Sequence, residues 1–590
     1  MLRDEVRRTN EAETAKSQER LVNPSNSDDK KNSNDTNDGK SDTEKLVEKA
    51  LDEKVQEQGL PEDDGSDTSE KIEDEIKEKK PDNPDDHHDD LQGSTVEIVQ
   101  PTDLKPKHLG FTRTLLLAMF AAMIGTGAQF GYALGVMNAP SEIIKNYTKE
   151  IYLKRYNSTI SDYYQDILYS TAISVIALGG VLGGLLATLL TDQFGRKTGL
   201  LLNNIPVILG SVLMVLSKFI ASFEAFIIGR ILIGFSAGFG ATVGPIYINE
   251  IAPIRVRGSF GACFQLFVAI AVLLAQVLGL DIFLGREHLW HYLFAVPIIF
   301  SLLQCVLLVF THETPKFLLQ KKRRKAAERA LKWFRCETDL EVIKAEIHDM
   351  EADFHNIQTS ATAISIRDLW SKPLLRKCLL ISAMTHVAQQ FTGCFAIFFF
   401  GDIILYHARL RMDYTSYAML SCGITYLAVA ISLVFILDKV GRRSLLLYGF
   451  IGMAASSCVI GVTILKSKNI PLFHMIFLEI FAMMANVGFC AMGPGAIPWM
   501  LSTEMFFQSE RVYASSVAII ANWLSMFAVI MTFVPLFYAV GALLFLAYAA
   551  MSCIFWLLTF LFVPETRRKI PERVQILVAK GTVYKAKHQQ

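Results

Sequence analysis

The stretch Asp192-Gln-Phe-Gly195-Arg196-Lys197 recurs in the second half of the chain as Asp438-Lys-Val-Gly441-Arg442-Arg443. Each copy places a carboxylate, a glycine and two cations between two long apolar segments. Other charged residues recur at nearly the same offset and in the same order: Glu250 with Glu504, Arg257 with Arg511, and Glu313 with Glu565. Self-similarity over so long a period indicates an internal duplication. Duplicated halves in a chain of apolar helices are typical of transporters.

The first hundred residues differ in composition from the rest of the chain. They hold about 30 acidic and about 15 basic residues and almost no aromatic ones, so they cannot bury enough apolar surface to fold. We therefore expect residues 1–109 to form a disordered acidic tail on the cytoplasmic side, without a signal peptide. The cluster around His87 and His88 matches no closed metal site, and neither a metal nor another cofactor is expected.

Beyond Leu109 the chain is dominated by apolar runs. A hydrocarbon core of about 30 Å requires about 20 apolar residues per helix. We therefore expect an all-α polytopic membrane protein with twelve transmembrane helices. The expected spans are near residues 113–135, 166–190, 198–218, 223–246, 258–280, 291–310, 374–400, 415–436, 443–465, 471–496, 511–535 and 540–562.

Six spans fall on each side of a polar interval. We expect residues 110–312 and 373–565 to form two six-helix bundles, joined by an intracellular helical linker domain over 313–372. An Ala- and Leu-rich stretch from Ala326 to Phe334 predicts an amphipathic helix in that linker. Residues 566–590 are expected to form a cytoplasmic C-terminal tail.

The cations predict the orientation of the spans. If the spans alternate, one side collects the cations Arg196, Lys197, Arg255, Arg257, Lys321 to Lys325, Arg442, Arg443, Arg567 and Arg568. The positive-inside rule makes that side cytoplasmic, so both termini are expected in the cytoplasm. The loop after the first span then lies outside, and it holds two glycosylation sequons, at Asn146 and Asn157.

Acids and arginines repeated in register across two halves can form a gate. Ion pairs of this kind would close the cytoplasmic face and break when it opens, each contributing little because water screens it. The alternative, which we favour for Lys321 to Lys325, is that cations at helix ends only anchor the topology. The residues expected in the gate are Asp192, Arg196, Arg230, Glu250, Arg257, Glu313, Asp438, Arg442, Glu504, Arg511 and Glu565.

Further motifs occur in a definite order along the chain. They are Gly229-Arg230, Tyr247-x-x-Glu250-x-x-Pro253-x-x-x-Arg257-Gly258, Gln389-Gln390, Gly493-Pro-Gly-Ala-Ile-Pro-Trp499 and Pro564-Glu565-Thr566. Together with the paired D-x-x-G-R-[RK] loops, they resemble the sugar-porter family of the major facilitator superfamily, and most closely animal facilitative hexose transporters. The resemblance covers about residues 110–570 and implies the major facilitator fold, with a central sugar site alternately open to either side.

Sugars need many hydrogen-bond partners, and polar side chains inside a bilayer are costly enough to be functional candidates. The run from Gly493 to Pro498 would break a helix, which is tolerated at membrane depth where backbone lines a cavity. The alternative for each polar residue is a hydrogen bond that holds the helices together. The candidate substrate-binding residues, several of them implied by the resemblance, are Asn138, Gln265, Gln389, Gln390, Thr392, Phe395, Tyr426, Trp499 and Asn522.

The chain departs from the family pattern at several of these positions. The family's glucose binders usually place Asn at Phe395, Tyr426 and Met526, and Glu at Ala491. They also carry Gln-Leu-Ser where this chain has His386-Val-Ala388. Each lost hydrogen bond to a buried hydroxyl would cost about 1–3 kcal/mol, so glucose is not expected to be a good substrate. Fructose, another hydrophilic ligand or very weak transport remain open.

The residues at particular positions also predict the mode of transport. Proton-coupled sugar porters place Asp directly after Phe-Gly-Tyr in the first span, whereas this chain has Ala133. With no obvious intramembrane carboxylate to carry a proton, and no Walker loop, we expect a uniporter. No nucleophile–base or metal-ligand constellation predicts an enzyme.

The function expected is therefore facilitative transport of a hexose or related sugar across the plasma membrane. The alternatives are a carrier of a polyol or another small solute, and a sensor that binds sugar without transporting it. The expected partners are the sugar and the lipid bilayer, with no nucleic acid; the oligomeric state is open.

Overall fold

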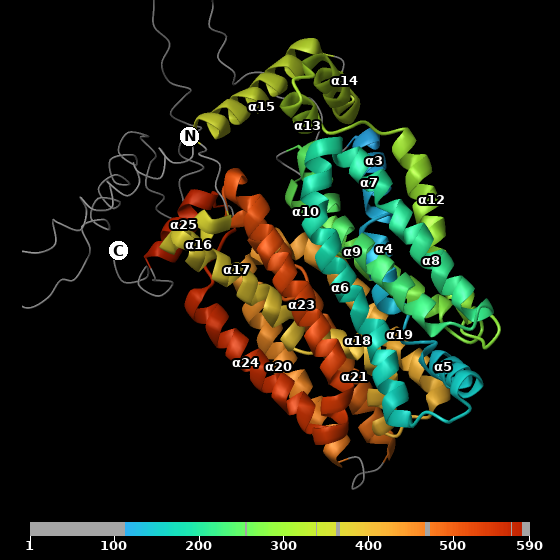
Figure 1. The fold of residues 1–590 in the computed structure, drawn as a ribbon. Helices are drawn as coiled ribbons and strands as arrows, with labels where there is room; N and C mark the ends of the chain where they lie inside the picture. The colour runs from blue at the N-terminus through green and yellow to red at the C-terminus, as the bar shows by residue number, and fades with distance from the viewer. Residues whose placement is uncertain are drawn as a thin grey trace, which may run out of the picture. The chain divides into compact units, whose positions relative to one another are not determined.

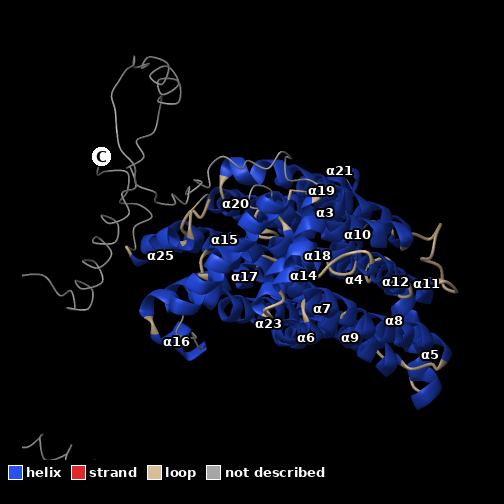
Figure 2. Cartoon of the chain, turned by 90° about the horizontal axis from the view of Figure 1, so that it is seen from above, coloured by secondary structure: helices blue, strands red, loops and turns tan. Residues whose placement is uncertain are grey.

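A computed structural model describes residues 112–253, 257–337, 339–360, 366–466, 472–567 and 569–580. All the regular secondary structure in these ranges is helical (Figure 2). The predicted disorder of residues 1–109 concerns a part of the chain that lies outside the described residues.

The structure confirms the twelve expected spans. Each is long and apolar enough to cross a membrane, with a mean hydropathy of 1.4 to 2.4 over its best window. The spans are Arg113–Gly135, Asp162–Phe194, Arg196–Phe219, Phe223–Ile251, Gly261–Leu278, Trp290–Val309, Pro373–His407, Tyr414–Leu437, Arg442–Lys466, His474–Glu504, Tyr513–Val540 and Leu543–Phe562.

The first six spans and the loop after the first of them contain ten helices. Side-chain caps start two of them: the Thr112 hydroxyl accepts from the Leu115 N–H, and the Ser222 hydroxyl accepts from the Ala225 N–H. The helices are α3 (Arg113–Ile124), α4 (Gly127–Gly135), α5 (Ser141–Tyr156), α6 (Asp162–Phe194), α7 (Arg196–Leu202), α8 (Asn204–Phe219), α9 (Phe223–Ile251), α10 (Arg257–Leu278), α11 (Trp290–Leu293) and α12 (Val296–Val309).

The last six spans and the segments around them follow the same pattern. Four helices form the linker: α13 (Pro315–Gln320), α14 (Arg324–Arg335), α15 (Leu340–Ser360) and α16 (Ile366–Ser371). The remaining helices are α17 (Pro373–Phe391), α18 (Cys394–His407), α19 (Met412–Val440), α20 (Arg442–Lys466), α21 (Leu472–Met492), α22 (Ile497–Glu504), α23 (Gln508–Val540), α24 (Leu543–Phe562) and α25 (Pro571–Ala579).

The two halves pack against each other through matching helices. Within the first half α6 lies on α9 and α4 on α10, and within the second α20 lies on α24 and α17 on α23. Between the halves, α6 contacts α23 (Figure 1), α10 contacts α19, and α4 contacts α18. These are the second and eleventh spans, the fifth and eighth, and the first and seventh, as a duplicated chain would produce.

Five of the described spans are each broken into two helices inside the membrane. The first breaks between α3 and α4, the third between α7 and α8, the sixth between α11 and α12, the seventh between α17 and α18 at Gly393, and the tenth between α21 and α22. The tenth-span break runs from Gly493 to Ala496, which confirms the prediction made from its glycines and prolines. Broken helices at this depth are tolerated where their backbone lines a cavity or is covered by protein.

The predicted amphipathic helix of the linker is confirmed as α14. It buries Ala327, Ala330, Leu331 and Phe334 and exposes most of its charged side chains. Gln575 of α25 donates to the Met505 carbonyl and to Glu510, so the described part of the C-terminal segment packs against the second half. The division of the chain into domains at the expected boundaries stays a prediction.

Candidate functional site

The duplicated charge motifs, around Arg196 and around Arg442, lie at one end of the unit formed by the two halves, and we call this end the basic face. In the first half, the Glu313 carboxylate accepts hydrogen bonds from the backbone N–H groups of Arg196 at 3.1 Å and Lys197 at 3.0 Å. The Arg196 side chain pairs with Glu250 at 3.1 Å and with Asp192 at 3.3 Å. Three helices and the segment after α12 are tied together in this way.

The described residues of the second half repeat this network. The Glu565 carboxylate accepts from the backbone N–H groups of Arg442 at 2.9 Å and Arg443 at 3.1 Å. The Arg442 side chain pairs with Glu504 at 3.0 Å, and the Thr566 hydroxyl donates to the same Glu504. The duplication seen in the sequence is therefore a duplication of geometry.

A glycine makes each network possible. Gly195 has φ +100° and Gly441 has φ +92°, a left-handed conformation that turns the following N–H groups toward the carboxylate. A Cβ on Gly195 would lie 2.3 Å from Glu313 Oε2, and one on Gly441 would lie 2.6 Å from Glu565 Oε2. Burial raises the pKa of Glu313 above its ordinary value, although the backbone N–H groups that it accepts from lower it.

The ion pairs described for these residues join helices of the same half. The side chains of Arg257 and Asp438 lie outside the described residues, so no contacts are given for their expected part in the gate. Arg511 donates to the Phe506 carbonyl at 3.3 Å. The gate itself therefore stays a prediction.

Arg230 does not belong to the basic face, which corrects its place among the expected gate residues. It lies in the second turn of α9, twenty residues before Glu250 on the same helix, or about 30 Å away at 1.5 Å per residue. Its fully buried guanidinium donates to the carbonyls of Ala133 and Ala172. Arg230 therefore ties α9 to α4 and α6 near the other end of the unit.

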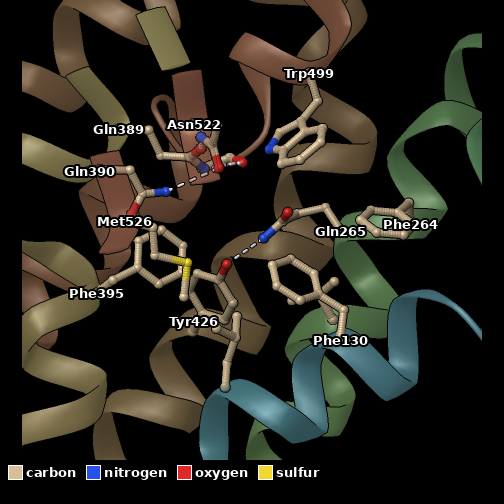
Figure 3. Close-up of a pocket in the computed structure, with 13 residues that line it drawn as sticks. Phe130, Phe264, Gln265, Gln389, Gln390, Phe395, Tyr426, Trp499, Asn522 and Met526 are labelled. Atoms are coloured by element: carbon tan, nitrogen blue, oxygen red, sulfur yellow. Dashed lines mark hydrogen bonds between the residues drawn. The ribbon is translucent and has the colours of Figure 1, made fainter. Parts of the chain in front are cut away.

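A pocket lies between the halves and is lined from both of them (Figure 3). The first half contributes residues of α4 and α10, namely Phe130, Leu134, Phe264, Gln265 and Val268. The second half contributes Gln389, Gln390, Phe395, Tyr426, Gly495, Trp499, Asn522 and Met526. Seven of the nine candidate substrate-binding residues are thus brought together around one pocket.

The amides on the second-half wall form a chain of hydrogen bonds. Asn522 Nδ2 donates to Gln389 Oε1 at 2.7 Å, and Gln389 Nε2 donates to the Gly495 carbonyl at 2.9 Å. Gln390 Nε2 donates to Asn522 Oδ1 at 3.3 Å, and Gln390 Oε1 has no partner among the described residues. These amides hold one another in place and leave acceptor capacity for a ligand hydroxyl.

One hydrogen bond crosses the pocket. Gln265 Nε2 of α10 donates to the hydroxyl of Tyr426 on α19, so the amide and the phenol connect the two halves (Figure 3). Rings crowd the space beside it: Phe130 lies 5.5 Å from Trp523 and 6.4 Å from Phe264 between ring centroids. The cavity between these side chains has a volume of only about 10 Å³. That is about the room that one water needs.

The departures from the family pattern account for part of this crowding. Phe395, Tyr426 and Met526, which stand where the family usually has Asn, all line the pocket. Ala491 is fully buried but does not line it. His386 lies behind the wall, with its ring 5.1 Å from that of Trp499 and its carbonyl accepting from Asn522.

The other two candidate substrate-binding residues do not line the pocket. Thr392 ends α17, and its hydroxyl donates to the Gln389 carbonyl at 3.2 Å, so it caps the broken seventh span. Asn138 follows α4 at the end of the unit opposite the basic face, where its Oδ1 accepts from the backbone N–H of Asp402 at 3.4 Å. The expected contact of these two side chains with substrate stays a prediction.

That opposite end also holds the two sequons, and we call it the sequon face. Asn157 is exposed, ends α5 with φ 51°, and is followed by exposed Ser158 and Thr159. Asn146 is exposed in the middle of α5, but Thr148 of its sequon is buried and bonded to the Ile144 carbonyl. The structure therefore makes Asn157 the more accessible acceptor.

Sequence reasoning missed two carboxylates inside the spans. Asp402 on α18 is 5% exposed and Glu479 on α21 is fully buried, where its carboxylate accepts from the Thr463 hydroxyl. Each is a single acid within an apolar run, which is itself the signal that could have found it. The expectation that the spans hold no obvious carboxylate was therefore wrong, whereas the expected uniport stays a prediction.

The chain is similar to known proteins along most of its length. Residues 117–577 match the family model described as "Sugar (and other) transporter". The facilitated glucose transporter member 1 of Gallus gallus is 31% identical over 471 residues, 80% of this chain and 94% of that protein. Member 4 of Homo sapiens is 33% identical over 490 residues, 82% of this chain and 94% of that protein.

Solved structures of the same architecture exist. The xylose transporter XylE from E. coli, in a partially occluded inward open conformation, matches with a TM-score of 0.65 and 21% identity over 78% of this chain and all of that chain. The proton:xylose symporter XylE bound to 6-bromo-6-deoxy-D-glucose also matches with a TM-score of 0.65 and 21% identity, over 79% of this chain and 99% of that chain. At this identity the likeness establishes the major facilitator fold.

Proposed function

This chain belongs to the sugar transporter family, and from that premise we propose that it is a uniporter that carries a hexose or related sugar by alternating access. Transport, rather than enzymatic chemistry, is the activity of this family. The observation that carries the finer proposal is the pocket between the halves, in which Gln265 faces the amide chain of Gln389, Gln390 and Asn522. Hydroxyl groups need such a set of amide donors and acceptors.

Alternating access requires that contacts between the halves form at one face at a time. Several hydrogen bonds between the halves lie at or toward the sequon face: Tyr538 to Asp166 at 2.8 Å, Tyr417 to Asp281 at 2.8 Å, and Ser141 to Asp402. At the basic face, the described ion pairs stay within each half. This distribution supports a conformer that is closed at the sequon face.

We assign the basic face to the cytoplasm, because cations gather on the cytoplasmic side of membrane proteins. The sequon face then lies outside, both termini lie inside, and the plasma membrane is the proposed location, as suits a chain similar to facilitated glucose transporters. The networks around Glu313 and Glu565 lie where a cytoplasmic gate would need them. They would hold the ends of each half rigid while the halves rotate.

The pocket also supports a second candidate within transport. Phe395 and Met526 offer no hydrogen bond to a hydroxyl, and Tyr426 already accepts one from Gln265. A solute with fewer hydroxyls at that end of the pocket, such as a deoxy sugar or a short polyol, would leave fewer groups unpaired. A sensor that binds without transporting is the remaining alternative.

A panel of radiolabelled hexoses, pentoses and polyols should be offered to a transport-null host that expresses the chain. We expect saturable uptake of at least one sugar, which stops when its concentrations inside and outside are equal. Gln389→Ala should lower that uptake, whereas Gln276→Leu, a buried amide outside the pocket lining, should keep the same solute preference. Binding without equilibration of any solute would favour the sensor, and uptake tied to a proton gradient would refute uniport.

A further inference from the structure

Asp402 is a buried carboxylate at the seam between the halves, on the sequon-face side of the pocket. It lies two residues after Phe400, where α18 departs from helical geometry with φ −125° and ψ 19°. The Ser141 hydroxyl of α5 donates to Asp402 Oδ2, and the Asp402 N–H donates to Asn138 Oδ1. Asp402 Oδ1 is buried and has no hydrogen-bond partner among the described residues.

The charges gathered around Asp402 do not balance. Lys145 Nζ lies 3.0 Å from Asp166 Oδ1 and 3.2 Å from Glu142 Oε1. Glu142 is half exposed, so water screens it, and the Lys145 ammonium is shared between buried Asp402 and partly buried Asp166. Burial alone would lower the pKa of Lys145, but Asp402, Asp166 and Glu142 outweigh it and hold that pKa above its ordinary value.

Other titratable groups on the surrounding helices are engaged with partners of their own. Tyr538 of α23 donates to Asp166 across the seam. The others are Tyr132 of α4, Tyr169 of α6, Arg230 of α9, His407 of α18, Tyr417 of α19 and Glu479 of α21.

The unbalanced charge exists only while the sequon face is closed. Ser141 and Asn138 belong to the first half and Asp402 to the second, so separating the halves there would break both contacts and admit water. A hydrated carboxylate is stable as an anion, whereas a buried one without enough partners favours its neutral form. The closed form should therefore bind one more proton than the open form.

We propose that Asp402 is a proton-binding site that links closure of the sequon face to the pH on that side of the membrane. A proton enters as the face closes and leaves to the same side when it reopens, since opening of that face is what hydrates Asp402. Lower pH favours the closed form, by up to tenfold per pH unit for one proton. The site modulates transport without coupling a net proton flow to it.

This inference rests on the proposed alternation, but its test does not require the substrate. Ser174 on α6 is fully buried at the same seam, with its hydroxyl 3.6 Å from Met531 Sδ of α23. Ser174→Cys should react with a membrane-impermeant thiol reagent added from the sequon side only when that face is open. Labelling rates are measured from pH 5.5 to 8.5, with the chain lacking this substitution as background.

Asp402→Asn in the Ser174→Cys background imitates the protonated site and reports the thiol's own pH dependence. We expect the rate with Asp402 to exceed that with Asp402→Asn at high pH, and the ratio to fall toward one as the pH falls. Glu479→Gln, the other intramembrane carboxylate, is the matched control and should leave that fall unchanged. A ratio that is constant with pH, or a fall that Glu479→Gln also abolishes, would overturn the proposal.

Lys145→Gln allows a second measurement, of the midpoint of the labelling curve, which does not depend on folding of the Asp402 variant. Loss of the ammonium removes the charge that favours ionised carboxylates, so the midpoint of the labelling curve should move to higher pH. An unmoved midpoint would contradict the assignment. If labelling behaves as expected in a chain that transports no tested sugar, the proton site stands and the proposed transport function fails. A proton flux in step with uptake would show that the proton does not return to the same side.

Discussion

Replacing Phe395 and Tyr426 by Asn should raise the affinity for glucose. Both side chains line the pocket, and they are only 6% and 3% exposed. Each ring occupies space in which an amide would offer a donor and an acceptor. Removing the Tyr426 phenol also frees the Gln265 amide, which now donates to it across the pocket.

The magnitude follows from the two hydrogen bonds restored. Each contributes about 0.5–1.5 kcal/mol, so the pair should lower the KM for glucose about five- to 150-fold. The same change removes two buried rings, and losing a buried aromatic side chain costs up to about 3–5 kcal/mol of stability. The pocket now admits about one water, so the added space is as necessary as the added polarity.

The assay is initial glucose uptake per molecule at the cell surface, with KM and the maximal rate determined separately. Tyr426→Phe is the matched control, since it frees Gln265 without opening space, and it should improve glucose affinity little. A parent that already transports glucose with the KM of the double variant would refute the reasoning. An equal gain in Tyr426→Phe would show that the cross-pocket bond, and not the volume, limits binding.

Four further changes test other parts of the structure. Gly195→Ala and Gly441→Ala should each destabilise the protein by about 1–3 kcal/mol of backbone strain, in addition to the clash with Glu313 or Glu565. Gly261→Ala, with open space around it, should not. The measure is the yield of monodisperse protein in detergent. Removing the charge of Arg257 or Glu504 should favour the form open at the basic face and slow labelling of Ser174→Cys from the sequon side, and unchanged labelling with normal transport would contradict the gate. Asn157→Gln should abolish the glycosidase-sensitive mobility shift that Asn146→Gln leaves in place. Deleting residues 1–100 should leave membrane insertion intact, and retention of the remainder inside the cell would count against that expectation.

The spans and their duplication were predictable because both depend on local composition. The length of an apolar segment determines whether it can cross a bilayer. The repeated motifs around Gly195 and Gly441 show the offset between the two halves directly. The pocket residues were predictable because amides inside spans are rare and several of them match a family pattern. The narrowness of the pocket was not, since it depends on how Phe130, Trp523 and Tyr426 pack together across helices.

The misplacement of Arg230 and the omission of Asp402 have different causes. Arg230 was grouped by charge type, although twenty residues of α9 separate it from Glu250 and the helical rise alone predicts opposite ends. The role of Asp402 depends on Ser141, which comes from a helix more than two hundred residues earlier. No spacing rule relates two such positions, because their contact exists only after the halves have packed.

The two faces of the unit differ in whether their contacts lie within each half or between the halves. This difference determines which residues can regulate a duplicated carrier. At the basic face both copies of the network survive, with a carboxylate held by backbone N–H groups in each half. The described bonds of these networks are made within each half, in a conformer that is closed at the sequon face. At the sequon face the contacts cross the seam, and the carboxylate there has an unpartnered oxygen and too few cations. Only a contact that is made in one conformer and lost in the other can bias the equilibrium between them. The unmatched residue, Asp402, is therefore a better candidate for regulation than any residue that the duplication repeats.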